Sequence, residues 1–132
     1  MNRPLLPQGW AKPKGYANGV AARGTVISVA GQIGWNPATG RFESDDFVAQ
    51  TKQALANIVA VLKEAGGGPE HLVRLTWYVT NKRDYVDRLA EIGEAYRAVI
   101  GRHFPAMTLV AVAGLVEDRA KIEIEATAVV PD

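Results

Sequence analysis

Hydrophobic positions along this chain repeat with two different spacings, and the spacing changes from one segment to the next. Over residues 45–65 the apolar side chains recur every three to four positions, which predicts an amphipathic helix with one buried face. The expected N-cap is Ser44, with Asp45 or Asp46 as the first helical residue at the positive end of the helix dipole. The run Gly66-Gly67-Gly68-Pro69 is typical of a helix end.

A second helix is predicted over residues 84–100, and an alternating strand precedes it at residues 72–80. The apolar side chains of the helix again follow helical spacing, and Gly101 is its expected stop. Alternate residues of the strand belong to two faces. One face carries Val73, Leu75, Trp77 and Val79, and the other carries Leu72, Arg74, Thr76 and Tyr78.

Four further segments have the pattern of strands. They are residues 16–22, 25–33, 107–113 and 121–130, with a tight turn at Arg23-Gly24 between the first two. The resulting order predicts an α+β domain with six strands and two long helices. Because strand–helix–strand crossovers are right-handed, both helices are expected on one face of the sheet. The other face mixes polar and apolar residues, so it is either wet or in contact with other subunits.

The composition fits a single domain over residues 1–132. Hydrophobic residues make up 48% of the chain and charged residues 22%, a balance typical of globular proteins. The formal net charge of +1 gives no reason to expect nucleic acid or a membrane as the partner. No signal peptide and no run of about 20 apolar residues is visible, so a cytoplasmic protein is expected.

Motifs for metals, cofactors and nucleophilic catalysis are missing from the sequence. The chain has no cysteine, and its two histidines, His71 and His103, have no metal-ligand spacing. No Walker loop, dinucleotide-binding glycine motif or nucleophile elbow is present. We therefore expect neither a metal nor a cofactor.

Small and polar residues at the strand ends are the remaining candidates for a site. Gly31, at the end of a strand, either lets a ligand approach the backbone closely or belongs to a turn or bulge. Tyr16 either supplies a phenol to a pocket or is an edge aromatic with a wet hydroxyl. Glu123 and Glu125 share one strand face, where they are either paired or solvated, or one of them is a general acid/base.

Several short motifs, each weak alone, together resemble the Rid (YjgF) family, some members of which are labelled endoribonuclease L-PSP. The resemblance covers about residues 16–130, in the family's order. The motifs are Gly31-Gln32-Ile33-Gly34, Pro37-Ala38-Thr39-Gly40, residues 50–58, residues 75–80, Phe104-Pro105-Ala106 and residues 122–126.

The resemblance implies a chorismate-mutase-like fold with a six-stranded mixed sheet and two long helices on one face. It also implies a homotrimer with a central barrel and with pockets between subunits. Archetypal members hydrolyse 2-imino or 2-enamino acids, and by resemblance Glu123 positions water while Tyr16 and Gly31 contact the substrate. Ala106 and Thr108 offer backbone or hydroxyl contacts. A connection of uncertain length leaves Glu125 as an alternative to Glu123.

Met107 departs from the family pattern, because it occupies the place of an arginine that binds the substrate carboxylate. An arginine fork forms two charge-assisted hydrogen bonds with a carboxylate. Losing them is expected to weaken binding by about tenfold to several hundredfold. Methionine offers only a polarizable apolar wall, so the archetypal imino-acid reaction is in doubt. Arg97, Arg102 and Arg119 are candidate replacements from elsewhere in the chain.

We therefore expect an intersubunit pocket for a small metabolite, with hydrolysis of an imine, an enamine or a related C=N bond and with substrate choice altered by Met107. The alternative is a non-catalytic trimer that binds a small molecule or acts like a chaperone. A third hypothesis is an endoribonuclease, against which the balanced charge and the lack of a basic-aromatic stripe argue.

Overall fold

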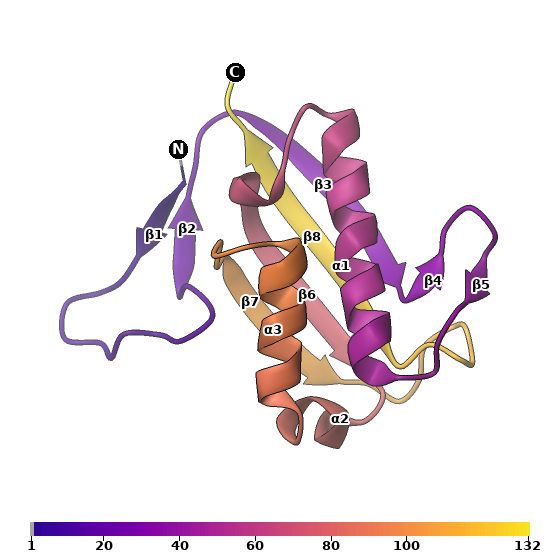
Figure 1. Ribbon diagram of the computed structural model, residues 1–132. Helices are drawn as coiled ribbons and strands as arrows, with labels where there is room; N and C mark the ends of the chain where they lie inside the picture. Colours follow the sequence, from indigo (N-terminus) through magenta and orange to yellow (C-terminus); the bar gives the residue numbers. More distant parts are fainter. Residues whose placement is uncertain (1) are drawn as a thin grey trace.

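The molecule is built on a four-stranded mixed sheet, and the computed structural model describes residues 2–132. The strands are β3 (Thr25–Ile33), β8 (Ile122–Val130), β6 (Leu72–Val79) and β7 (Ala106–Ala111), in that order across the sheet. β7 runs parallel to β6, and the other neighbours are antiparallel. β3 and β7 are therefore the two edges of the sheet (Figure 1).

Two helices, α1 (Phe47–Glu64) and α3 (Leu89–Val99), cover the same face of this sheet (Figure 1). Their inner side chains and the helix-facing strand residues form one apolar core. Leu55, Ile58 and Leu75 in this core are fully buried. The prediction that both helices share one face is confirmed, and residues 2–132 leave the opposite face of the sheet without a covering helix.

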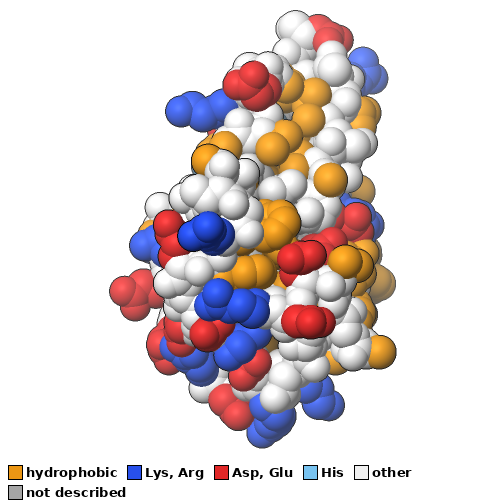
Figure 2. All heavy atoms as spheres, turned by 90° about the vertical axis from the view of Figure 1, so that its right-hand side faces the viewer, with side chains coloured by type: hydrophobic (Ala, Val, Ile, Leu, Met, Phe, Trp, Pro, Cys, Tyr) orange, Lys and Arg blue, Asp and Glu red, His pale blue; other side chains and the backbone are white. Residues whose placement is uncertain are grey.

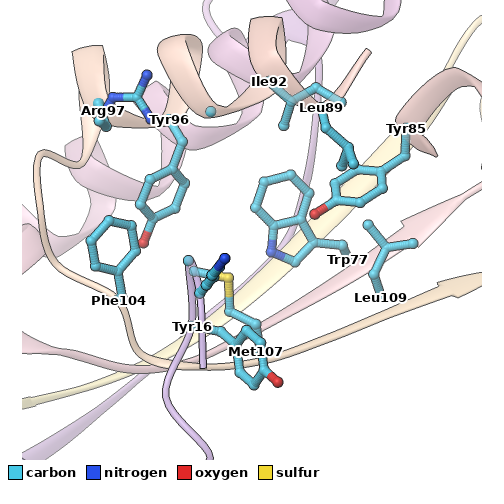
Figure 3. A pocket seen from close by; sticks show the side chains of 13 residues that line it. Tyr16, Trp77, Tyr85, Leu89, Ile92, Tyr96, Arg97, Phe104, Met107 and Leu109 are labelled. Carbon is cyan, nitrogen blue, oxygen red and sulfur yellow. The ribbon is translucent and has the colours of Figure 1, made fainter. Parts of the chain in front are cut away.

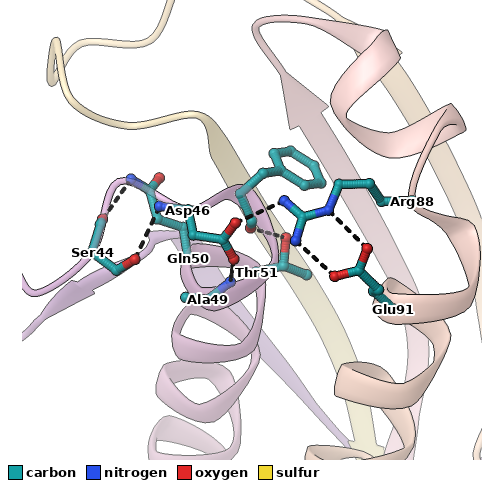
Figure 4. Close-up of polar contacts among 8 residues, drawn as sticks. Ser44, Asp46, Ala49, Gln50, Thr51, Arg88 and Glu91 are labelled. Carbon is teal, nitrogen blue, oxygen red and sulfur yellow. Dashed lines mark hydrogen bonds and ion pairs between the residues drawn. The ribbon is translucent and has the colours of Figure 1, made fainter.

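The second predicted helix is divided. α2 (Lys82–Val86) ends before α3 begins, and Arg88 between them has φ −131° and ψ 32°, outside the helical region. The Arg88 guanidinium bonds the carboxylates of Asp46 and Glu91, each at 2.7 Å (Figure 4). This pair of contacts ties the start of α3 to the start of α1. Because apolar spacing continues across the break, the sequence pattern predicted one helix.

The N-cap of α1 is Asp46 and not Ser44. A carboxylate oxygen of Asp46 accepts a hydrogen bond from the Ala49 N–H at 3.0 Å. The Ser44 hydroxyl accepts from the Asp46 N–H at 2.9 Å (Figure 4). Ser44 and Asp46 thus both contribute oxygens at the start of the helix. The helix begins at Phe47, one residue after Asp46, the later of the two predicted first residues.

Gln50, in the first turn of α1, is almost completely buried and joins the helix to two loops. Its amide nitrogen donates to the carbonyls of Ser44 and Arg119, both at 3.1 Å. Its amide oxygen accepts from the Lys121 N–H at 2.9 Å. The side chain therefore fixes the segment that leads into β8.

The N-terminal strands differ from the prediction, so the sheet has four strands and not six. Of residues 16–22 only β2 (Gly19–Ala21) is a strand, and it pairs with β1 (Arg3–Leu5) instead of forming a hairpin with β3. β4 (Trp35–Asn36) and β5 (Arg41–Phe42) form a separate two-stranded ladder. The predicted α+β class and mixed sheet are confirmed.

The register of β6 shifts between Leu72 and Arg74, and this shift places Leu72 in the core. Leu72 is 3% exposed, whereas Val73 is only partly buried. The expectation that Leu72 shares a face with Arg74 is therefore wrong. Beyond the shift the predicted alternation holds, since three alternate residues are buried: Leu75, Trp77 and Val79.

The surface carries charges of both signs. Acidic and basic side chains are interspersed over the lower half of the face shown in Figure 2, with hydrophobic side chains between them. Within residues 2–132, no helix is both long enough and apolar enough to span a membrane.

Candidate functional site

Met107 lies on the helix-covered side of the edge strand β7. The parallel register places Met107 beside Leu75 of β6, which is fully buried under the helices. Because laterally paired residues project to the same face of a sheet, Met107 and Leu109 pack against the core. Ala106 and Thr108 belong to the opposite face by alternation.

A pocket with a cavity volume of about 420 Å³ opens beside Met107. It lies between α3, the strands β6 and β7, and residues 14–16 of the N-terminal segment (Figure 3). Its walls are mainly apolar, contributed by Tyr16, Trp77, Tyr85, Leu89, Ile92, Tyr96, Phe104, Met107 and Leu109. The size and the lining are typical of small-molecule sites.

Trp77 is the centre of an aromatic cluster in this pocket. Its ring meets Tyr85 edge to face, with centroids 6.1 Å apart, and stacks with Tyr96 at 6.4 Å. Phe104 stacks on Tyr96 at 5.7 Å. Burial raises the pKa of Tyr85 and of Tyr96 above the ordinary phenol value. Both phenols are therefore neutral near pH 7, and neither is a general base there.

The indole N–H of Trp77 is buried without a hydrogen-bond partner among the described residues. Trp77 is 4% exposed, so ordinary solvent contact does not satisfy this donor. Figure 3 shows the indole nitrogen on the edge of the ring that points toward Met107. A thioether is only a weak acceptor, and no hydrogen bond joins the two side chains.

Among residues 2–132, the charged side chains that line the pocket are both cationic, those of Lys14 and Arg97. Both residues are exposed, and neither has an ion-pair partner within residues 2–132. A Cβ added at Gly93 would lie 3.1 Å from an Arg97 guanidinium nitrogen, so the guanidinium folds back along α3 over this glycine. The pocket therefore has positive charge at its rim and an apolar interior.

Gly31 and Glu123 form a second candidate cluster, at the opposite edge of the sheet. The pairing of β3 with β8 shifts between Val29 and Gln32, which places Gly31 in a bulge. A Cβ at Gly31 would lie only 2.1 Å from Oε2 of Glu123. The missing side chain thus leaves space for the Glu123 carboxylate against the backbone. The interpretation of Gly31 as a bulge residue is confirmed, and the close approach of a ligand to it stays a prediction.

Glu125, the alternative to Glu123, is already engaged. Its carboxylate accepts a hydrogen bond of 2.5 Å from the Tyr78 hydroxyl. This bond raises the pKa of Tyr78. The side chain of Glu123 makes no hydrogen bond or ion pair within the described chain, so its carboxylate is available to bind or orient another molecule.

The structure brings some of the predicted site residues together and separates others. Tyr16 and Met107 share the pocket. Glu123 lies on the strand next to the other edge, and on the face of the sheet that the helices leave bare. Thr108 is also on that face, and Ala106 is joined to the N-terminal segment by a bridge to Ala17. One chain therefore contains two separate candidate clusters, at opposite edges of the sheet.

The candidate replacements for the missing arginine have different surroundings. Arg97 lines the Met107 pocket. Arg119 pairs with Asp45 at 2.8 Å and lies over the Phe42 ring, and Arg102 belongs to a different depression. Of the three candidate arginines, Arg97 is therefore the one that lies beside Met107. Lys14 also lines this pocket, although nothing in the sequence predicted it there.

Trp77, Tyr85 and Tyr96 line this cavity, which the sequence pattern did not predict. Apolar spacing predicts that such aromatic residues are buried, and buried residues normally fill a core instead of lining a cavity. Three aromatics on the inner faces of consecutive elements were the available signal. Among the described residues no group of three His, Asp or Glu side chains could hold a metal ion.

Comparison with known proteins gives consistent matches over most of the chain. The family model described as Endoribonuclease L-PSP matches residues 10–130. A RutC family protein of Pyrococcus abyssi is 37% identical over 117 residues, covering 89% of this chain and 88% of its own. The Escherichia coli protein named 2-iminobutanoate/2-iminopropanoate deaminase is 38% identical over 117 residues, 86% of each chain. The crystal structure of YyfB, a Rid-family protein of Yersinia pestis, matches with a TM-score of 0.80 and 32% identity over 98% of each chain.

Proposed function

Since the chain belongs to the Endoribonuclease L-PSP family, which includes the Rid proteins, we propose that it hydrolyses an imine or an enamine of a small metabolite. The observation that carries this proposal is the position of Glu123, whose unpaired carboxylate lies in the space left by Gly31. A carboxylate in this setting can orient a water molecule and accept its proton. The name of the Escherichia coli relative, an iminobutanoate and iminopropanoate deaminase, supports the same reaction class.

The proposed reaction adds water across a C=N bond. The water oxygen bonds to the imine carbon, and one water proton passes to the Glu123 carboxylate. The same proton then reaches the nitrogen and gives a carbinolamine. The hydroxyl proton of this intermediate passes to the nitrogen in turn, again through the Glu123 carboxylate, so that the C–N bond breaks and ammonia leaves as the carbonyl forms. The described part of the Met107 pocket has no aspartate, glutamate or histidine, so the proton acceptor must come from outside this pocket.

A homotrimer would supply that acceptor, and we include it in the proposal. The two candidate clusters lie at opposite edges of the sheet, β7 on one side and β3–β8 on the other. Joining the β7 edge of one subunit to the β3 edge of the next would bring the strand of Met107 beside the bulge at Gly31, where the Glu123 carboxylate lies. The bare face, with Arg74, Thr76 and Thr127 on it, would then lie toward the other subunits.

Met107 alters the substrate choice in this proposal. It presents an apolar thioether where the family resemblance implies a guanidinium, and the nearby cations Lys14 and Arg97 are exposed at the rim. Exposed charges are screened by water and salt. A small substrate held mainly by its carboxylate is therefore expected to bind less well here than in an arginine-containing relative.

The proposal is tested by ammonia release from imines made in situ, with Glu123→Gln as the test variant. Turnover is expected to fall by about 100-fold or more, the usual contribution of a positioned acid/base group. Glu125→Gln is the matched control, because it removes the neighbouring carboxylate on the same strand face, and it should keep most of the activity. Equal losses in both variants, or none in Glu123→Gln, would exclude the role given to Glu123.

A non-catalytic binding protein is the second candidate function. The Met107 pocket favours it, since its aromatic walls can bind a ligand without any acid/base group. Saturable ligand binding in calorimetry, with no ammonia release from any imine even in Met107→Arg, would support this alternative over hydrolysis.

A further inference from the structure

We infer that the Met107 pocket takes an aromatic molecule whose carbonyl oxygen accepts a hydrogen bond from Nε1 of Trp77. The inference rests on the proposed function, because it names the substrate class of the same pocket. The substrate would be the imine of this aromatic carbonyl compound, and its hydrolysis would leave the carbonyl compound in the pocket as the product.

The unpaired indole N–H is the first support. Trp77 is 4% exposed, and its Nε1 has no acceptor among the described residues. A buried donor without a partner is unfavourable, and most buried polar groups are paired. Nε1 itself has almost no accessible surface, so the side chains that cover it must shift on binding, and an acceptor atom on the bound molecule would then satisfy this donor. The indole nitrogen donates only, so the ligand atom that meets it must be an acceptor such as a carbonyl oxygen.

The shape and chemistry of the walls are the second support. Trp77 has Tyr85 at its edge and Tyr96 stacked near its face, and Met107 closes another side (Figure 3). Aromatic rings prefer edge-to-face and offset-stacked neighbours, and thioethers make favourable contacts with rings. The cavity of about 420 Å³ exceeds the roughly 150 Å³ that suffices for benzene in an apolar cavity. It therefore has room for a ring with a short substituent.

The charges decide that the carbonyl group, and not a carboxylate, is the main polar anchor. Lys14 and Arg97 are exposed, so their attraction for an anion is weakened by solvent. Trp77 Nε1 is buried, where a hydrogen bond is stronger. A carboxylate on the ligand is accordingly tolerated at the rim but is not required.

The test uses an isosteric pair of probes, phenylacetone and isobutylbenzene, which differ by an oxygen in place of a methyl group. Each is titrated into ¹⁵N-labelled protein while the indole N–H signals of the three tryptophans are followed by NMR. We expect phenylacetone to shift the Trp77 signal downfield and to bind about five- to about 150-fold more tightly than isobutylbenzene. 2-Butanone, which keeps the carbonyl and lacks the ring, should bind more weakly than phenylacetone.

Trp77→Phe assigns the signal and removes the donor while it keeps an aromatic ring. It should reduce phenylacetone binding to the level of isobutylbenzene, whereas Trp35→Phe, in β4, should leave binding unchanged. If Trp77→Phe does not fold, Trp10→Phe and Trp35→Phe assign the Trp77 signal by elimination, and the probe pair on the natural protein still decides the matter. A Trp77 signal that moves with neither probe, or equally with both, overturns the inference.

The outcome is separable from that of the proposed function. The ketone probes are not hydrolysed, so their binding without turnover of any imine would contradict the hydrolase proposal alone. Efficient turnover of small aliphatic imines with no response to phenylacetone would contradict the aromatic assignment alone.

Discussion

The Glu123 carboxylate occupies the space that a side chain at Gly31 would fill, since a Cβ there would lie 2.1 Å from Oε2. The two residues come from adjacent strands and are more than ninety positions apart in the chain. Their contact makes the glycine a positioning residue for the carboxylate. The bulge in β3 lies at the same point.

Gly31→Ala is expected to lower imine hydrolysis strongly and stability only slightly. The added methyl group would displace the carboxylate, but the end of a glutamate side chain can move away at little free-energy expense. Turnover and thermal unfolding are measured together. Gly114→Ala is the control, because no atom lies within 4 Å of the Cβ it would add. Unchanged turnover in Gly31→Ala would show that the position of Glu123 is unimportant.

Met107→Arg is expected to strengthen binding of a small carboxylate ligand, such as 2-oxobutanoate, by about tenfold or more. The guanidinium would add charge-assisted hydrogen bonds that the thioether cannot form. Met107→Leu keeps the apolar wall and should bind this ligand as the natural protein does. Calorimetry gives both affinities. Tight binding of 2-oxobutanoate by the unmodified protein would contradict the role assigned to Met107.

Arg88→Met is expected to change how stability depends on pH. Hydrogen bonds from Arg88 lower the pKa of Asp46 and of Glu91 below their ordinary values. A carboxyl group with a lowered folded-state pKa stabilises the fold above its unfolded pKa, near 4, and this contribution disappears as the pH falls through the folded-state pKa. The natural protein should therefore exceed the variant in stability at pH 7 and lose that advantage toward pH 2.

The measurement is urea unfolding at several pH values. Arg83→Met serves as control, because the ion pair of Arg83 with Asp87 joins two exposed side chains at 3.2 Å. A difference between natural protein and Arg88→Met that stays constant from pH 7 to pH 2 would refute the assignment to these two carboxyl groups.

Gln50→Leu is expected to destabilise the fold by about 2–4 kcal/mol, because it removes three hydrogen bonds and leaves backbone groups of two loops without partners. The side chain is 1% exposed, so water cannot replace those bonds without opening the structure. Urea unfolding measures the loss of free energy. Gln8→Leu, at an exposed position, should change stability little. A similar small effect at Gln50 would mean that the loops readjust.

Much of the fold could be predicted from the sequence, because it depends on local periodicity. The helical spacing of apolar residues in α1 and the alternation in β6 and β8 reflect one-sided burial. They sufficed for the α+β class and for the shared face of the helices. Short motifs such as Phe104-Pro105-Ala106 indicated the family and drew attention to Met107.

Tertiary structure decided the remaining features, because they depend on pairing between distant segments. The partner of β2 is β1 and not β3, and the register shift at Leu72 changes its face. Local spacing contains no information about either pairing.

For the candidate site, too, some features follow from the sequence and others only from the tertiary structure. The chemistry of Met107 and Glu123 follows from their residue types, and so the sequence alone was enough to name both as candidates. Only the strand order β3-β8-β6-β7 places them toward opposite edges of the sheet, and only packing gathers Trp77 and Tyr96 around the cavity beside Met107. A residue's chemistry is local, whereas its neighbours are set by contacts between segments that the chain brings together from far apart.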